Sequence, residues 1–180
     1  MKKKQKVDLV IANLLILLGV ILTILPKFNI VKINITLFIV MIIYATLNMI
    51  QYALTKKSND MEGLFTSILS YVIGISGLTF NLFDNLLQMV LLLLAWIILM
   101  SLIKLKKCDY YNDSNNKIWI LKVISLGLFI LTGIITCINL YYSADIQLII
   151  LGLFFYIHGI LEMLDPITIY LMENNNENSK

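Results

Sequence analysis

Four ionisable residues inside the hydrophobic second half of the chain have the most potential for chemistry. Lys122 lies in one apolar run, His158 and Glu162 lie in the next, and Asp165 directly follows it. The last three follow one another at steps of four and three residues, so a helix would place them on one face. Lys122 precedes, and Glu162 follows, the short turn near residue 143 by a similar number of residues. The sequence therefore predicts one polar cluster at a single depth.

This cluster has two interpretations. An ionised group within a membrane is costly alone, so it pairs with an opposite charge or faces the interior of the bundle. We predict an ion pair between Lys122 and either Glu162 or Asp165. The pair would fix the register of two helices, or it would form a site that responds to protons or to a ligand. In the second case, acidification would protonate His158 and then the carboxylates, and would loosen the pair.

The sequence predicts neither a cofactor nor catalysis. One histidine and two carboxylates on a single helix face lack the second histidine or cysteine that zinc and iron sites normally use, so no metal site is predicted. Haem held between helices commonly needs more than one histidine, and the chain has a single one. No nucleophile stands in a recognisable pattern with a base, and we do not expect an enzyme.

The residues that must position the cluster are strongly apolar. Of 180 residues, 59% are hydrophobic and 14% are charged, whereas soluble domains carry about 25% charged residues. The charges are clustered, which leaves apolar runs long enough to cross a bilayer as helices. Because lipid offers no partner to backbone N–H and C=O groups, such runs must be helical. The predicted fold class is an all-α integral membrane protein with six transmembrane helices.

The six runs form one predicted transmembrane domain, at residues 1–172. The runs cover residues 7–25, 33–54, 64–80, 86–102, 118–140 and 146–164. They would pair as three helical hairpins at about 7–54, 61–105 and 117–166, each a tight antiparallel pair joined by its outer turn. Residues 173–180 are polar and are predicted to be a disordered cytoplasmic tail.

The lysines indicate the orientation of the chain. With the six runs as spans, Lys27 and Lys32 lie on one side, and the other lysines lie on the side of both termini. An excess of lysine in short connections marks the cytoplasmic side. We predict a protein of the cell membrane with both termini in the cytoplasm. No basic patch lies on a folded aqueous surface, so nucleic-acid binding is not indicated.

Glycines in the spans indicate close helix packing and an internal repeat. Gly19, Gly74 and Gly127 each lie near the middle of an odd-numbered run, about one helix pair apart, which predicts three repeated hairpins. Small residues let helix backbones approach closely in membranes. We predict helix packing at Gly19, Gly74, Gly127, Gly133, Gly152 and Gly159.

The last hairpin carries a family resemblance. The segment from Trp119 to Gly133 has an aromatic and basic start followed by spaced glycines, and Gly152 and Gly159 continue the pattern in the returning helix. Together with the glycine-centred hairpins, it resembles the HdeD-type acid-resistance membrane proteins. The resemblance covers nearly the whole chain and implies a six-helix protein associated with acid or envelope stress. It implies no catalytic residue.

A second resemblance stays open. A six-helix chain of this length also resembles the substrate-binding subunits of energy-coupling-factor transporters, which would make it a small-molecule transport component. Against this, the first helix offers only Ala12 with Ile16 where that family has paired alanines. The expected surroundings are the lipid bilayer, and a homo-oligomer or a membrane partner protein remains open.

Overall fold

The computed structural model describes residues 3–28, 33–55, 61–113, 118–142 and 146–178, and these residues are almost entirely helical. Its elements are α1 (Lys3–Ile24), the short 3-10 helix η1 (Leu25–Phe28), α2 (Ile33–Thr55), α3 (Glu62–Thr79), α4 (Leu86–Asp113), α5 (Ile118–Tyr142) and α6 (Gln147–Asn178). All six α-helices are long and apolar enough to cross a membrane. The predicted fold class and number of spans are confirmed.

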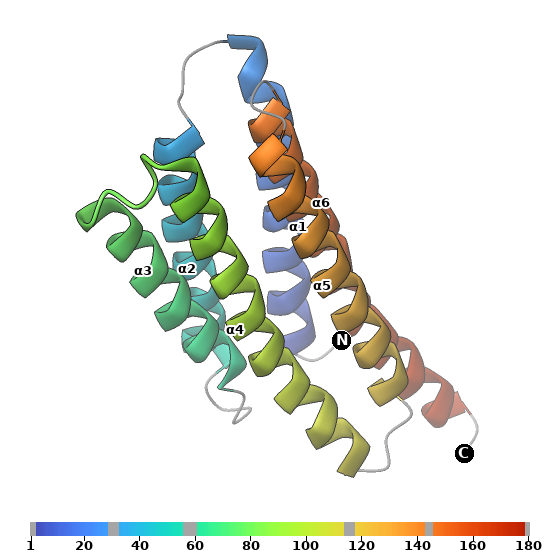
Figure 1. The fold of residues 1–180 in the computed structure, drawn as a ribbon. Helices are drawn as coiled ribbons and strands as arrows, with labels where there is room; N and C mark the ends of the chain where they lie inside the picture. The colour runs from blue at the N-terminus through green and yellow to red at the C-terminus, as the bar shows by residue number, and fades with distance from the viewer. Residues whose placement is uncertain (1–2, 29–32, 56–60, 114–117, 143–145, 179–180) are drawn as a thin grey trace.

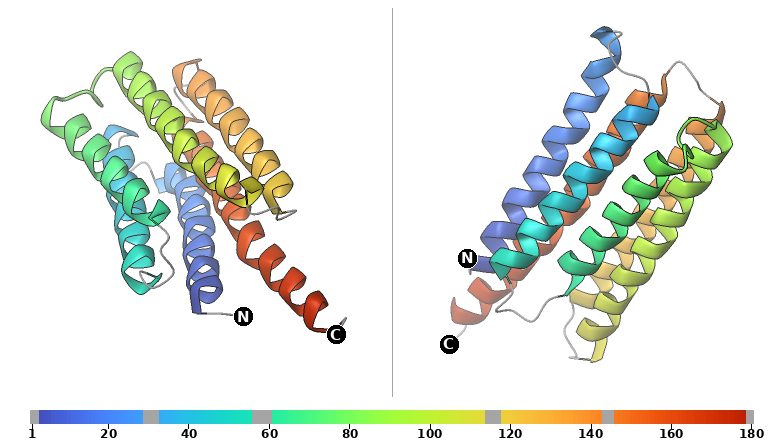
Figure 2. Two further views of the ribbon diagram at one scale, coloured as in Figure 1. Left: turned by 90° about the horizontal axis from the view of Figure 1, so that it is seen from below. Right: turned by 90° about the vertical axis from the view of Figure 1, so that its left-hand side faces the viewer.

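The six helices form a closed ring in chain order. Each helix packs against the next, and α6 returns to pack against α1. Seen along the bundle, α2, α1 and α6 form one layer and α3, α4 and α5 form the other (Figure 2). Both described ends of the chain lie at the same end of the bundle, which we call the terminal end (Figure 1). Large apolar side chains on the outside of all six helices fit a lipid environment.

The closest helix pairs differ from the predicted hairpins. The most extensive packing joins α1 to α6, α2 to α3 and α4 to α5, whereas α1 and α2 pack against each other much less. The predicted hairpin partners do pack against each other, but the most extensive contacts join helices of different hairpins. The reason is the position of the small residues, which lie on the faces where α1 meets α6 and α2 meets α3.

Glycines hold α1 and α6 together. A Cβ atom at Gly152 would lie 2.8 Å from the carbonyl oxygen of Gly19, and one at Gly19 would lie 2.7 Å from that of Gly152. Two helical turns further along α6, a Cβ atom at Gly159 would lie 2.7 Å from the backbone nitrogen of Ile16. The two backbones are thus in contact, and a larger side chain at any of these glycines would push them apart.

Of the remaining predicted packing glycines, two contact a neighbouring helix and one does not. Gly74 meets Met41 of α2, and Gly133 meets Ile97 of α4, so packing at both is confirmed. The prediction is wrong at Gly127, where no described atom lies within 4 Å of a Cβ position apart from its own helix. This glycine faces the outside of the bundle. Because Gly19, Gly74 and Gly127 have different surroundings, the internal repeat stays a prediction.

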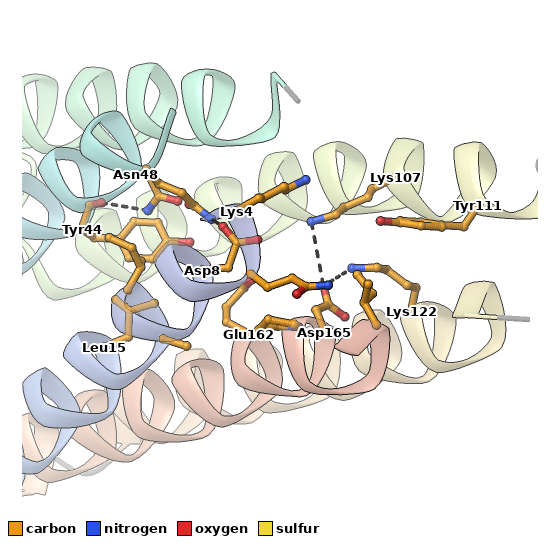
Figure 3. Close-up of a pocket in the computed structure, with 16 residues that line it drawn as sticks. Lys4, Asp8, Leu15, Tyr44, Asn48, Lys107, Tyr111, Lys122, Glu162 and Asp165 are labelled. Atoms are coloured by element: carbon orange, nitrogen blue, oxygen red, sulfur yellow. Dashed lines mark hydrogen bonds and ion pairs between the residues drawn. The ribbon is translucent and has the colours of Figure 1, made fainter. Parts of the chain in front are cut away.

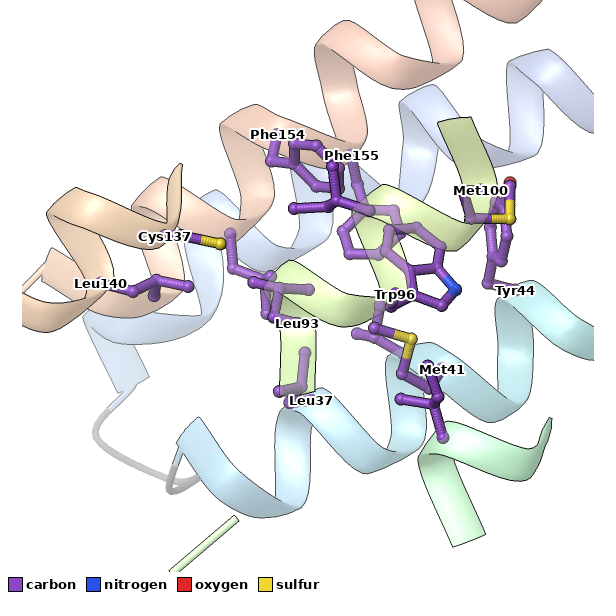
Figure 4. Close-up of a cluster of buried hydrophobic side chains, with 14 of the residues drawn as sticks. Leu37, Met41, Tyr44, Leu93, Trp96, Met100, Cys137, Leu140, Phe154 and Phe155 are labelled. Carbon is purple, nitrogen blue, oxygen red and sulfur yellow. The ribbon is translucent and has the colours of Figure 1, made fainter. Parts of the chain in front are cut away.

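An aromatic core fills the middle of the ring (Figure 4). Trp96 of α4 is fully buried, and its indole N–H donates a hydrogen bond to Ser70 Oγ of α3 at 2.9 Å. The ring centroids of Tyr44 and Phe154 lie 5.4 and 6.1 Å from that of Trp96, in edge-on arrangements that favour aromatic pairs. Since α2, α3, α4 and α6 all contribute, this core fixes the two layers against each other.

Two helices extend beyond their predicted spans at the terminal end. Helix α4 continues to Asp113, and α6 continues to Asn178 despite Pro166 within it. Residues 173–178, predicted to be disordered, are therefore helical, and residues 179–180 lie outside the described residues. The apolar run ends earlier than the helix because a helix that leaves the bilayer keeps its internal hydrogen bonds in water.

Candidate functional site

A polar cavity of about 190 Å³ lies at the terminal end of the bundle. Figure 3 shows it between α1, α2, α4, α5 and α6. Lys4 and Tyr111, near helix ends, line its outer part, and Leu15 and Tyr44 line its inner part. Tyr44 also packs against Trp96, so the aromatic core begins where the cavity stops. The site is therefore a partly open vestibule that the core closes on its inner side.

The structure brings the four predicted site residues together. Lys122, Glu162 and Asp165 line the cavity, and His158 lies one helical turn before Glu162 on α6, buried outside the cavity wall. Lys122 donates a hydrogen bond to Asp165 Oδ2 and forms an ion pair with it. The predicted pairing of Lys122 with an acidic residue of the last helix is confirmed, and Asp165 is the partner.

Two further ion pairs extend the cluster. Lys104 pairs with Glu162, and Lys107 pairs with Glu62 at the start of α3. The Lys107 ammonium also lies 3.8 Å from Asp165 Oδ2. The lysines come from α4 and α5 and the carboxylates from α3 and α6, so this ion-pair network joins four helices. Pairing offsets the cost of removing these charges from water.

His158 connects the network to the aromatic core. Its side chain is 1% exposed, and its Nε2 atom lies 2.9 Å from Tyr44 Oη and 3.9 Å from Glu162 Oε1. Its ring stacks on Phe154 and lies 4.9 Å from the centroid of Phe129. No described atom bonds to Nδ1. A line of polar contacts thus runs from Tyr44 through His158 to the charged network.

Helices α1 and α2 supply the other polar wall. Gln51 Nε2 donates a hydrogen bond to Asp8 Oδ1 at 2.7 Å, which links the two helices. Asn48 Nδ2 donates to the backbone carbonyl of Tyr44 at 2.8 Å and is itself buried. Amide groups of this kind can donate and accept hydrogen bonds. This wall can therefore bind polar groups of either character.

Two acceptor oxygens on α6 lack their usual partners. Asp165 Oδ1 is buried and has no hydrogen-bond partner among the described residues. Pro166 has no N–H, so the backbone carbonyl of Glu162 loses the donor that a helix normally provides four residues later. Glu162, Asp165 and Pro166 all line the cavity. Asp165, in the cavity wall, therefore has spare capacity to accept a hydrogen bond.

Sequence reasoning missed half of this site. Lys104 and Lys107 lie beyond the predicted span at residues 86–102, although their spacing of three residues places them on one helical face. Glu62 stands in the first turn of α3, and a search for acids at the same depth as Lys107 could have found it. Nothing in the sequence pairs Tyr44 with His158.

The chemistry open to the site is binding and proton response. Among the described residues, no group of three or more His, Cys, Asp and Glu side chains is arranged to hold a metal ion. Its charged groups can pair with a ligand or lose their pairing when the carboxylates are protonated. No protein-family model matches the chain, and neither a curated protein nor a solved structure matches it.

Proposed function

We propose that this chain is a non-enzymatic, multi-pass protein of the cell membrane that acts in acid or envelope stress. The resemblance to the HdeD-type proteins supports this role. The lysine excess at the terminal end supports an orientation with both termini in the cytoplasm. In this proposal the protein responds to a fall in cytoplasmic pH through its own helix packing.

The observation that carries the proposal is the ion-pair network that joins α3, α4, α5 and α6. Lys104, Lys107 and Lys122 stay charged in acid, whereas protonation of Glu62, Glu162 and Asp165 would remove the opposite charges. Three neighbouring ammonium groups would then repel one another. The cavity brings water to this network, so protons can reach it.

Survival after acid challenge tests this proposal. A deletion strain is complemented with the parent, with Lys122→Met or with Glu162→Gln, at matched membrane abundance. Lys106→Met is the control, because Lys106 lies on α4 at the same end of the bundle but is exposed. We expect the parent and the control to restore survival and the two network variants to fail. Equal survival of all strains, including the deletion, would refute a role in acid stress.

The cavity favours a second candidate, a small-molecule binding or transport component. A polar vestibule that is open at one end and closed by an aromatic core at the other is typical of a binding site in a transporter that faces one side. Purification from native membranes tests this candidate. Copurification of an ATPase module would support it over the stress role, and the same sample would reveal a homo-oligomer or a membrane partner.

A further inference from the structure

The charges in the cavity wall are balanced. Lysines and carboxylates line it in equal number: Lys4, Lys107 and Lys122 against Asp8, Glu162 and Asp165. A ligand with a net charge would leave one charge without compensation in a site of low dielectric constant. A polar ligand with no net charge avoids this cost. The balance therefore favours a neutral ligand or a zwitterion.

The positions of the charges favour a zwitterion. Asp165 lies between Lys122, its ion-pair partner, and Lys107, whose ammonium is 3.8 Å away. The buried Oδ1 atom of Asp165 has no hydrogen-bond partner among the described residues and can accept a hydrogen bond from a ligand ammonium group. A ligand carboxylate beside that ammonium would meet the two lysines. An α-amino acid carries an ammonium group and a carboxylate this close together.

The inner end of the cavity limits the rest of the ligand. It is lined by Ile11, Ala12 and Leu15 of α1 and by the ring of Tyr44. These residues carry no charge, so they would contact an apolar substituent of the ligand. The volume of about 190 Å³ equals that of about six water molecules in the liquid. It is below the range of about 300–1,000 Å³ for pockets that bind drug-sized ligands, so a ligand as large as a nucleotide is excluded.

We infer that the cavity binds a compact zwitterion of the α-amino acid type with a small apolar side chain. Its ammonium group would contact Asp165, its carboxylate would contact Lys107 and Lys122, and its side chain would point toward Leu15. This inference rests on the second candidate function, solute binding in the cavity, and it names the class of solute.

Thermal unfolding of the full chain in detergent tests the inference with three probes that share the same branched alkyl group. Valine carries both charges, isobutylamine lacks the carboxylate and isovalerate lacks the amine. We expect valine at about a hundred times its Kd to raise Tm by about 5 °C or more. The two single-charge analogues should not shift Tm.

Matched variants locate the binding. Lys122→Met and Asp165→Asn should abolish the shift with valine, whereas Lys106→Met and Asp109→Asn, at exposed positions of α4, should keep it. If isobutylamine or isovalerate raises Tm and Lys122→Met removes that effect, the cavity binds a solute but the inferred class is wrong. If valine stabilises every variant equally, it binds elsewhere and the inference is overturned.

A separate measurement distinguishes failure of the inference from failure of solute binding. Asn48→Cys, in a chain with Cys108→Ala and Cys137→Ala, reports whether a small water-soluble thiol reagent enters the cavity. Modification without any shift by valine would overturn the zwitterion alone. Neither modification nor a shift would show that the cavity is closed to solutes, and the second candidate function would fail with it.

Discussion

Tyr44 Oη of α2 lies 2.9 Å from His158 Nε2 of α6, in a fully buried contact between the charged network and the aromatic core. This hydrogen bond joins two helices that are not neighbours in the ring. A buried imidazole nitrogen without a partner is costly. The contact therefore contributes to holding α2 and α6 in register around the cavity.

Tyr44→Phe should destabilise the protein by about 1–3 kcal/mol, because it leaves His158 Nε2 without its hydroxyl partner and changes little else. The free energy of unfolding in mixed micelles measures this loss. Tyr156→Phe is the control, since Tyr156 lies on the same helix as His158 with an exposed side chain. Similar stability of Tyr44→Phe and the parent would show that the hydrogen bond contributes nothing.

Lys122→Met should destabilise the protein by roughly 3 kcal/mol, the low end of the cost of breaking a buried ion pair. The Lys122 side chain is 5% exposed, and its loss leaves Asp165 with only the more distant Lys107. The double variant Lys122→Met with Asp165→Leu should recover most of that stability, because neither charge is then buried alone. Additive losses in the double variant would contradict this pairing.

Gly152→Ala and Gly127→Ala should have opposite effects although both lie in spanning helices. At Gly152 the new methyl group would meet α1, and we expect a loss of about 1–3 kcal/mol from overpacking. At Gly127 the space is open, and the higher helix propensity of alanine should stabilise the helix by up to about 1 kcal/mol. The free energy of unfolding of both variants checks the close contact between α1 and α6. Equal effects of the two substitutions would argue against that contact.

The stability of the parent should fall as the pH is lowered from about 5 to about 2, because an ion-paired carboxylate contributes stability that is lost only below the ordinary pKa of a carboxyl group, about 4. Each ion pair of the network stabilises the fold only while its carboxylate is charged. Lys122→Met with Asp165→Leu has one pair fewer and should show a shallower dependence. Unfolding of both proteins across this range provides the comparison. Parallel curves would mean that the Lys122–Asp165 pair does not contribute to acid sensitivity.

The features that the sequence determined are those that lipid imposes on any chain. Six long apolar runs must form helices, because backbone groups in lipid have to bond within their own segment. Depth could also be counted from a short turn, which is why the pairing of Lys122 with an acid of α6 was predictable. The packing of Gly152 and Gly159 followed from the need of membrane helices for small residues at close contacts.

The tertiary structure alone decided which faces meet. Helices that are apolar on nearly every side carry little periodic pattern to mark an inner face, so the sequence could not place Gly127 outside the bundle or join α1 to α6. The partners of Glu162 and His158 come from α4 and α2, far away in the chain. Their meeting depends on how the ring closes, and ring closure is set by packing across all six helices rather than by any local pattern of residues.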